Sequence, residues 1–127
     1  MMRFGFANIL LLLLIGSAAA APPAIVDDRL VIELAAREPD IVTPTGLAVD
    51  EQGRVWVVEN NTHQRPSNYK GHPSDRIRIL SEPGADGMFR KVTTFADGFK
   101  NGMGLALGRN GDVFLATRSD IWRLRDT

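Results

Sequence analysis

Both histidines of the chain, His63 and His72, lie in one polar stretch, residues 60–75, that also carries arginine, tyrosine and lysine. His63 follows closely after Glu59, and a carboxylate can orient an imidazole that acts as a general base. Cationic side chains in such a stretch can bind carboxylate or phosphate groups. We take as candidate catalytic residues Glu59 and His63, and as candidate binding residues Arg65 and Lys70.

Two alternatives stand beside this interpretation. His63 could instead be a surface histidine of a flexible loop, and His72, next to a proline, is better explained as structural or exposed. Imidazole and carboxylate groups also suit several divalent ions, so Glu59 with the two histidines could form a metal site. Nothing fixes the spacing that such a site needs, and we predict no metal centre.

The polar stretch lies inside a sequence repeat. Residues 44–59 are echoed by residues 102–117, at an offset of 58 residues. Each copy has a short apolar segment, a polar turn ending in glycine and a second segment of β-branched or aromatic residues. This pattern predicts two β-hairpins, in which Gly53 and Gly111 supply the positive φ of the turns.

Further strand patterns follow each hairpin, at residues 76–80, 92–96 and 121–124. Four strands per unit, repeated along the chain, are typical of the blades of a β-propeller. We therefore predict an all-β fold, an incomplete β-propeller of about two four-stranded blades. Blade one covers about residues 44–96, and blade two covers about residues 101–127 and is truncated.

A small sandwich or barrel would also give short strands at regular spacing. The likeness between the hairpins and the lack of helical periodicity after residue 21 favour the propeller. Residues 30–35 are expected to form a strand that completes the last blade of a closed ring. Because two blades cannot close a ring, we expect missing C-terminal blades and no activity from this chain by itself.

The N-terminus has the three parts of a secretory signal peptide. A positive charge at Arg3 precedes an apolar run at 9–15 and small residues at 16–21. The alternative, an uncleaved anchor, is disfavoured because the run is shorter than the ~20 residues that span a bilayer. We predict a signal peptide over residues 1–20, export to the periplasm or the cell exterior, no stable transmembrane anchor after cleavage, and a propeller region over residues 21–127.

Composition excludes several classes. The 127 residues contain no cysteine, so disulfides and cysteine-ligated zinc, haem or iron–sulfur sites are ruled out within the chain. Lys and Arg total 15 against 15 Asp and Glu, and this balance predicts no nucleic-acid partner. The sequence also lacks a phosphate-binding glycine loop and a nucleophile elbow.

Residues 30–124 resemble the N-terminal blades of the secreted, planctomycete-type "membrane-bound dehydrogenase" propellers. That family is related to glucose/sorbosone dehydrogenases that depend on pyrroloquinoline quinone (PQQ). The hairpin pattern by itself also occurs in NHL-type and lactonase-like propellers. The resemblance is carried by residues 36–50, 55–63, 75–77 and 95–106.

The resemblance implies a fragment of an exported sugar or aldose dehydrogenase that uses PQQ and a small sugar substrate. In such an enzyme His63 would take the hydroxyl proton while hydride passes to the quinone. Asn101 stands just before a strand that contacts the cofactor in PQQ sugar dehydrogenases, and becomes a third candidate binding residue. The alternative is a non-catalytic, NHL-like propeller that binds carbohydrate or protein.

Members of the family commonly carry an Asp-rich calcium loop between the third and fourth strands of a blade. Here that turn, residues 81–87, offers carboxylates only at Glu82 and Asp86. A calcium loop needs more oxygen ligands at alternate positions. We therefore expect no calcium in this part of the protein.

Overall fold

The computed structural model describes residue 21 and residues 23–125, so the predicted signal peptide, residues 1–20, lies outside the described residues. The chain divides into two units, residues 1–32 and 33–127, which are considered separately. Over the described residues the fold is all-β, with seven strands, one short 3-10 turn and no α-helix. None of these residues belongs to a helix with the length and apolarity of a membrane span.

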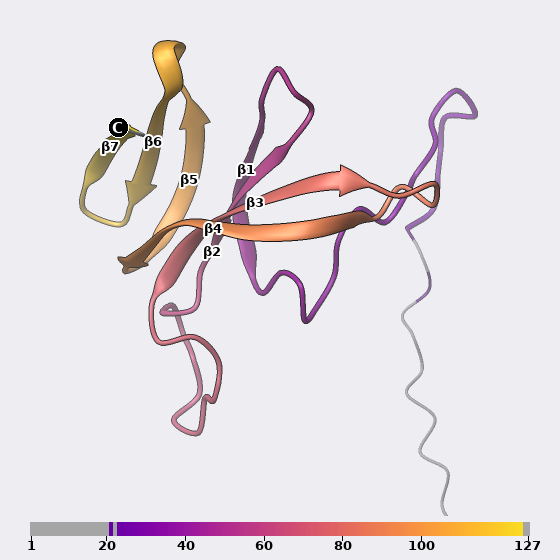
Figure 1. Cartoon of the computed structure of the whole chain (residues 1–127). Helices are drawn as coiled ribbons and strands as arrows, with labels where there is room; N and C mark the ends of the chain where they lie inside the picture. Colours follow the sequence, from indigo (N-terminus) through magenta and orange to yellow (C-terminus); the bar gives the residue numbers. More distant parts are fainter. Residues whose placement is uncertain (1–20, 22, 126–127) are drawn as a thin grey trace, which may run out of the picture. The chain divides into compact units, whose positions relative to one another are not determined.

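The second unit holds two antiparallel sheets (Figure 1). The first sheet has the order β1-β2-β3-β4, with β1 (Pro44–Val49), β2 (Val55–Glu59), β3 (Asp75–Pro83) and β4 (Phe89–Phe99). The second sheet has the order β5-β6-β7, with β5 (Gly102–Leu107), β6 (Asp112–Thr117) and β7 (Ile121–Arg125), and the 3-10 turn η1 (Arg109–Gly111) joins its first two strands.

The two predicted hairpins are confirmed. Gly53 and Gly111 have φ values of 74° and 77°, the left-handed region that glycine enters without a steric penalty. Each hairpin also has one irregularity in its strand pairing, at the equivalent position of the repeat. The register shifts between Pro44 and Gly46 in the first hairpin and between Gly102 and Gly104 in the second. The sequence repeat is therefore also a structural repeat, down to the position of an irregularity.

The strand patterns at 76–80, 92–96 and 121–124 correspond to β3, β4 and β7, of which β3 and β4 extend several residues further than predicted. The prediction of a strand at residues 30–35 is wrong, because those residues have no regular secondary structure in this chain. A strand needs a neighbour that satisfies its backbone groups. Here the backbone carbonyl of Ala35 accepts one hydrogen bond from the N–H of Phe89, at 3.0 Å.

The main core lies between the two sheets. Trp56, Val58 and Ile77 of the first sheet pack with Val113 and Leu115 of the second, and all five are buried. Consecutive residues of β2 are buried on both faces, as its unbroken apolar run predicts. The sheets thus form one packed body.

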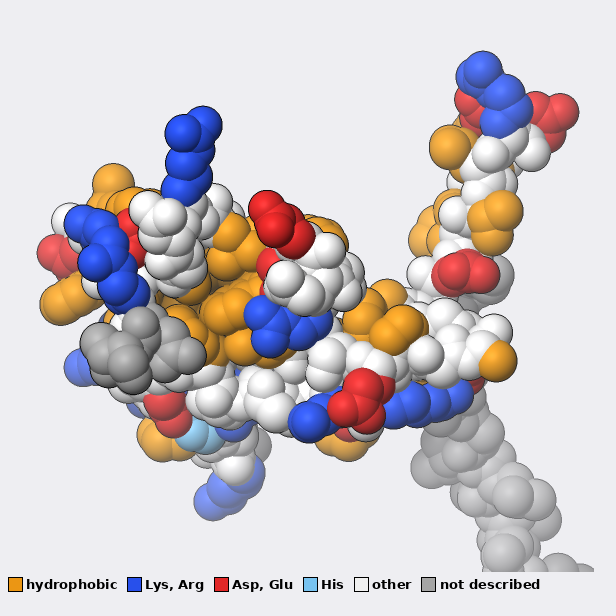
Figure 2. Space-filling model, turned by 45° about the horizontal axis from the view of Figure 1, so that its top comes forward, with side chains coloured by type: hydrophobic (Ala, Val, Ile, Leu, Met, Phe, Trp, Pro, Cys, Tyr) orange, Lys and Arg blue, Asp and Glu red, His pale blue; other side chains and the backbone are white. Residues whose placement is uncertain are grey.

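The other face of the first sheet carries a smaller core. Ile41, from the segment before β1, packs with Val57 and Leu80. Leu47 of β1 lines a pocket together with these three residues and is 64% exposed, and Val49 of the same strand is 58% exposed. Figure 2 shows that hydrophobic side chains lie open on the surface between charged ones.

The hairpins have two distinct ends. The short turns 50–54 and 108–111 lie at one, which we call the turn end (Figure 1). At the opposite, loop end lie the long connection 60–74, the link 100–101 and the turn 118–120. Connecting loops on a rigid scaffold are the usual carriers of binding residues.

Candidate functional site

A pocket of about 480 Å³ opens at the loop end, and we call it the loop-end pocket. Ligand pockets commonly have volumes of roughly 300–1,000 Å³. Its lining comes from both hairpins and, among the described residues, contains no carboxylate. The lining residues are Thr45, Asn60, His63, Asn101, Met103 and Arg118.

His63, the predicted base, lines this pocket and is exposed. Its backbone N–H donates to Oδ1 of Asn60 at 3.0 Å. Nδ2 of the buried Asn60 in turn donates to the carbonyl of Gly102 at 2.9 Å, and Thr45 Oγ1 donates to the same carbonyl at 3.0 Å. The backbone at His63 is therefore fixed to the start of the second hairpin.

Asn101 lines the same pocket, together with Arg118, a residue that the sequence analysis did not select. Its φ is 52°, a left-handed conformation that asparagine tolerates better than most residues. Its N–H donates to Thr62 Oγ1 at 2.8 Å, and its carbonyl accepts the N–H of Arg118 at 3.0 Å. Asn101 thus ties together the connections at the loop end.

Glu59 does not line the pocket, and its side chain is fully buried. Its carboxylate accepts hydrogen bonds from Arg76 Nε at 2.6 Å, from Arg78 Nη1 at 3.3 Å and from the N–H of Val42 at 3.1 Å. These contacts hold the segment before β1 against β2 and β3. Over the described residues, His63 is not among the recorded partners of this carboxylate.

Arg65 and Lys70 are exposed and do not line the loop-end pocket. Arg65 Nη1 donates to the carbonyl of Pro73 at 3.0 Å, and its guanidinium lies 5.9 Å from the ring centre of Tyr69. The Tyr69 hydroxyl donates to Asn61 Oδ1 at 2.7 Å. Arg65 therefore folds the long connection onto itself.

The second histidine belongs to a different contact. Nε2 of His72 lies 3.2 Å from Oδ2 of Asp97, on β4. Burial opposes ionisation of Asp97, but hydrogen bonds from Ser74 and from the N–H of Gly98 keep the pKa of this carboxyl below its usual value. His72 joins the long connection to the first sheet, in keeping with its interpretation as a structural residue.

No role was predicted for Asp75, the first residue of β3, yet its side chain is fully buried. Oδ1 accepts the N–H groups of Asn61 and Thr62 at 2.7 and 2.8 Å. Oδ2 accepts the N–H of Gly102 at 2.7 Å and the Thr62 hydroxyl at 3.1 Å. One feature of the sequence could have indicated Asp75: it is an acidic residue at the point where a long polar connection enters a predicted strand.

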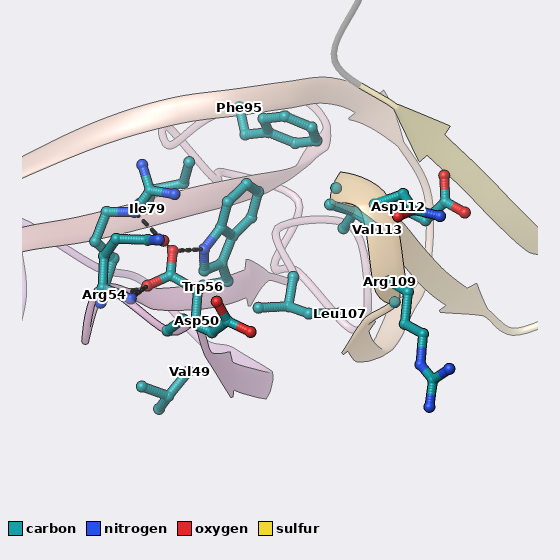
Figure 3. Close-up of a pocket in the computed structure, with 15 residues that line it drawn as sticks. Val49, Asp50, Arg54, Trp56, Ile79, Phe95, Leu107, Arg109, Asp112 and Val113 are labelled. Carbon is teal, nitrogen blue, oxygen red and sulfur yellow. Dashed lines mark hydrogen bonds and ion pairs between the residues drawn. The ribbon is translucent and has the colours of Figure 1, made fainter.

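A second pocket, of about 570 Å³, lies at the turn end between the turns 50–54 and 108–112. Figure 3 shows Asp50 between Trp56 and Arg54, which donate to its carboxylate at 2.9 and 2.6 Å. Burial raises the pKa of Asp50, but these hydrogen bonds outweigh it and bring the pKa below the usual value.

Asp112 lines the opposite wall of that pocket (Figure 3). Arg125 Nε and Arg123 Nη2 donate to its carboxylate at 2.8 and 2.7 Å. Hydrogen bonds from Arg125 and then Arg123 lower the pKa of Asp112 from 3.8 to about 2. Its partners come from its own sheet, so we assign this carboxylate to the stability of the second sheet.

The described residues hold no group of three or more histidine, aspartate or glutamate side chains placed to share a metal ion. Within residues 81–87, predicted as a turn, the first three residues belong to β3, and the two carboxylates face basic side chains of β4. Glu82 Oε1 lies 3.3 Å from Lys91 Nζ, and Asp86 Oδ1 lies 2.7 Å from Arg90 Nη2.

Residues 20–127 match the model of a family described as a domain of unknown function, DUF7133. The chain belongs to this family. The match spans both sheets and the whole lining of the loop-end pocket, so the pocket is part of the DUF7133 domain itself. Neither the curated proteins nor the solved structures contain a match to the chain.

Proposed function

We propose that this DUF7133 chain forms two neighbouring blades of an exported β-propeller whose loop-end pocket belongs to a PQQ-type sugar dehydrogenase site. Further blades would complete the ring, and the predicted signal peptide would direct export. The packing of the two sheets supports the proposal of neighbouring propeller blades. The lining of the loop-end pocket supports the proposal of a PQQ-type site.

The propeller proposal rests on how the repeats stack. The face of the first sheet that carries Trp56 packs against Leu105 and Leu115 of the second sheet. The repeat equivalents of those leucines, Leu47 and Val57, lie on the opposite face of the first sheet. Each sheet therefore presents equivalent faces in the same direction, as blades do around a propeller axis.

The site proposal rests on one observation: His63, Asn101 and Arg118 come from different connections of two repeats and line one pocket. An exposed imidazole there can accept the proton of a substrate hydroxyl. The Arg118 guanidinium and the Asn101 amide can donate to carboxylate and quinone oxygens.

PQQ carries carboxylates, and a lining that has an arginine, two asparagines and a histidine but no carboxylate fits such a group. When bound, PQQ would accept the hydride released from the sugar. Within the chain, Arg118 would hold a carboxylate, Asn101 would orient the ligand and His63 would hold the substrate proton. Arg65 and Lys70 lie outside the lining, so Arg118 takes their proposed place.

A second candidate, an NHL-like propeller that binds carbohydrate or protein without catalysis, is favoured by the contacts of Glu59. This carboxylate is occupied by Arg76 and Arg78. An imidazole without a carboxylate partner is a weaker base but a good hydrogen-bonding group for hydroxyls.

Binding measurements on the 127-residue chain separate the two candidates. We expect PQQ, followed by calorimetry and its visible absorbance, to bind the chain, and Arg118→Gln to weaken binding about tenfold by removing a charge-assisted hydrogen bond. The matched control is Arg109→Gln, an exposed arginine of the second repeat at the turn end, which should leave binding unchanged. Binding of neutral sugars without PQQ binding would support the NHL-like candidate and contradict the first.

A further inference from the structure

We infer that Asp75 is the positioning residue of the loop-end pocket. Its buried carboxylate joins the connection after β2 to the start of β5, and this junction brings the pocket-lining residues of the two repeats together. Only the identity of the ligand rests on the proposed function.

The surroundings of Asp75 are unusual for a buried carboxylate. The side chain is fully buried, and over the described residues its recorded partners include no arginine, lysine or histidine. Burying a charge is costly unless hydrogen bonds replace water. The three backbone N–H groups and one hydroxyl around Asp75 provide this replacement, and charge-assisted bonds of this kind are stronger than neutral ones.

Two routes lead from Asp75 to the pocket. In the first, the Thr62 hydroxyl donates to Asp75 and accepts the N–H of Asn101 at 2.8 Å. In the second, Asp75 holds the N–H of Gly102, while the carbonyl of Gly102 accepts the side chain of Asn60 at 2.9 Å. Asn60 also accepts the backbone N–H of His63, so both routes end at a residue of the lining.

The second repeat shows that a hairpin of this type does not need a buried carboxylate to connect its strands. There β6 passes to β7 through the turn 118–120, and the carbonyl of Asp120 accepts the N–H of Thr117, within the same hairpin. Asp75 instead binds an element of the other sheet. The buried carboxylate accompanies the long connection that carries His63.

The test is Asp75→Asn, which keeps the size of the side chain but removes its charge and sets an NH₂ group among donors. We expect hydrogen exchange at the amides of Asn61, Thr62 and Gly102 to accelerate about tenfold or more, with the central amides of β2 and β3 unchanged. The His63 imidazole resonance should move toward that of an unstructured histidine. PQQ affinity should fall about tenfold because its ligands are no longer held in place.

Asp112→Asn is the matched control, because it removes a strand-start carboxylate from the turn end and should leave these readouts unchanged. If Asp75→Asn does not fold, Thr62→Val replaces it, since this variant breaks only the first route and should expose the amide of Asn101. Unchanged exchange and an unchanged His63 resonance in the folded variant would overturn the inference. Hydrogen exchange and the His63 resonance can be measured without a ligand. If they change as expected but PQQ does not bind, the result contradicts the proposed function and leaves the inference on Asp75 intact.

Discussion

The two ends of the hairpins use carboxylates in opposite ways. At the turn end, Asp112 is held by Arg123 and Arg125, two cations of its own sheet. At the loop end, Asp75 is held by neutral donors that come from the start of the long connection preceding it and from the other sheet. One carboxylate stabilises a sheet, and the other joins separate segments.

This difference determines what each pocket offers a ligand. The turn-end pocket has both signs of charge in its lining, and two of its three carboxylates, Asp50 and Asp112, are already paired with arginines. In the loop-end pocket no carboxylate lies near Arg118 among the lining residues. An anionic group would therefore find, at the loop end, a cation that has no ion-pair partner among the residues that the structure describes, and competing carboxylates at the turn end.

The largest expected effect concerns Glu59, which pairs with two arginines as Asp112 does, but in a fully buried place. Glu59→Gln leaves the largely buried Arg76 and Arg78 without the charged carboxylate that both of them contact. We expect the free energy of unfolding, measured with urea, to fall by about 3 kcal/mol. Glu82→Gln, at an exposed pair, is the control and should cost less than about 1 kcal/mol. Equal effects of the two variants would contradict this account of Glu59.

The next effect tests the contact between the hairpins. A Cβ at Gly46 would lie 2.8 Å from the Cα of Gly104, so Gly46→Ala must push β1 and β5 apart. We expect a loss of about 1–3 kcal/mol in urea unfolding.

The repeat supplies the control for this variant. A Cβ at Gly104 would meet only the Cβ of Ala116, at 4.0 Å, which is an ordinary contact. Gly104→Ala should therefore cost clearly less than Gly46→Ala. The reverse order would show that the two hairpins do not pack as described.

The smallest effect is the pH dependence contributed by Asp112. Its pKa is lowered from 3.8 to about 2, so its stabilising contribution is complete above pH 3.8 and is lost as the pH falls through 2. Asp112→Asn should flatten the stability profile within this window, and it should lower the stability by a constant amount at higher pH, including neutral pH, because the variant lacks the contribution altogether. A profile that keeps its wild-type slope between these pH values would contradict the ion pairs with Arg123 and Arg125.

Local pattern was sufficient to predict the hairpins, because Gly53, Gly111 and the apolar runs act within a few residues. The long polar stretch after Glu59 also indicated His63, whereas Asn101 became a candidate only through the resemblance to PQQ sugar dehydrogenases. The partners of Glu59 could not be predicted, because they depend on the register between β2 and β3 across a long connection. Asp75 escaped notice for the same reason, as its donors lie far from it in the sequence.

The most direct test of the account is an amide chemical-shift map of the full 127-residue chain titrated with PQQ. We predict shifts at the loop end, in residues 60–63, 101–103 and 118, and none in the turns 50–54 and 108–112. Shifts concentrated at the turn end, or spread over both ends alike, would contradict the claim that the two repeats join at the loop end to form a ligand site.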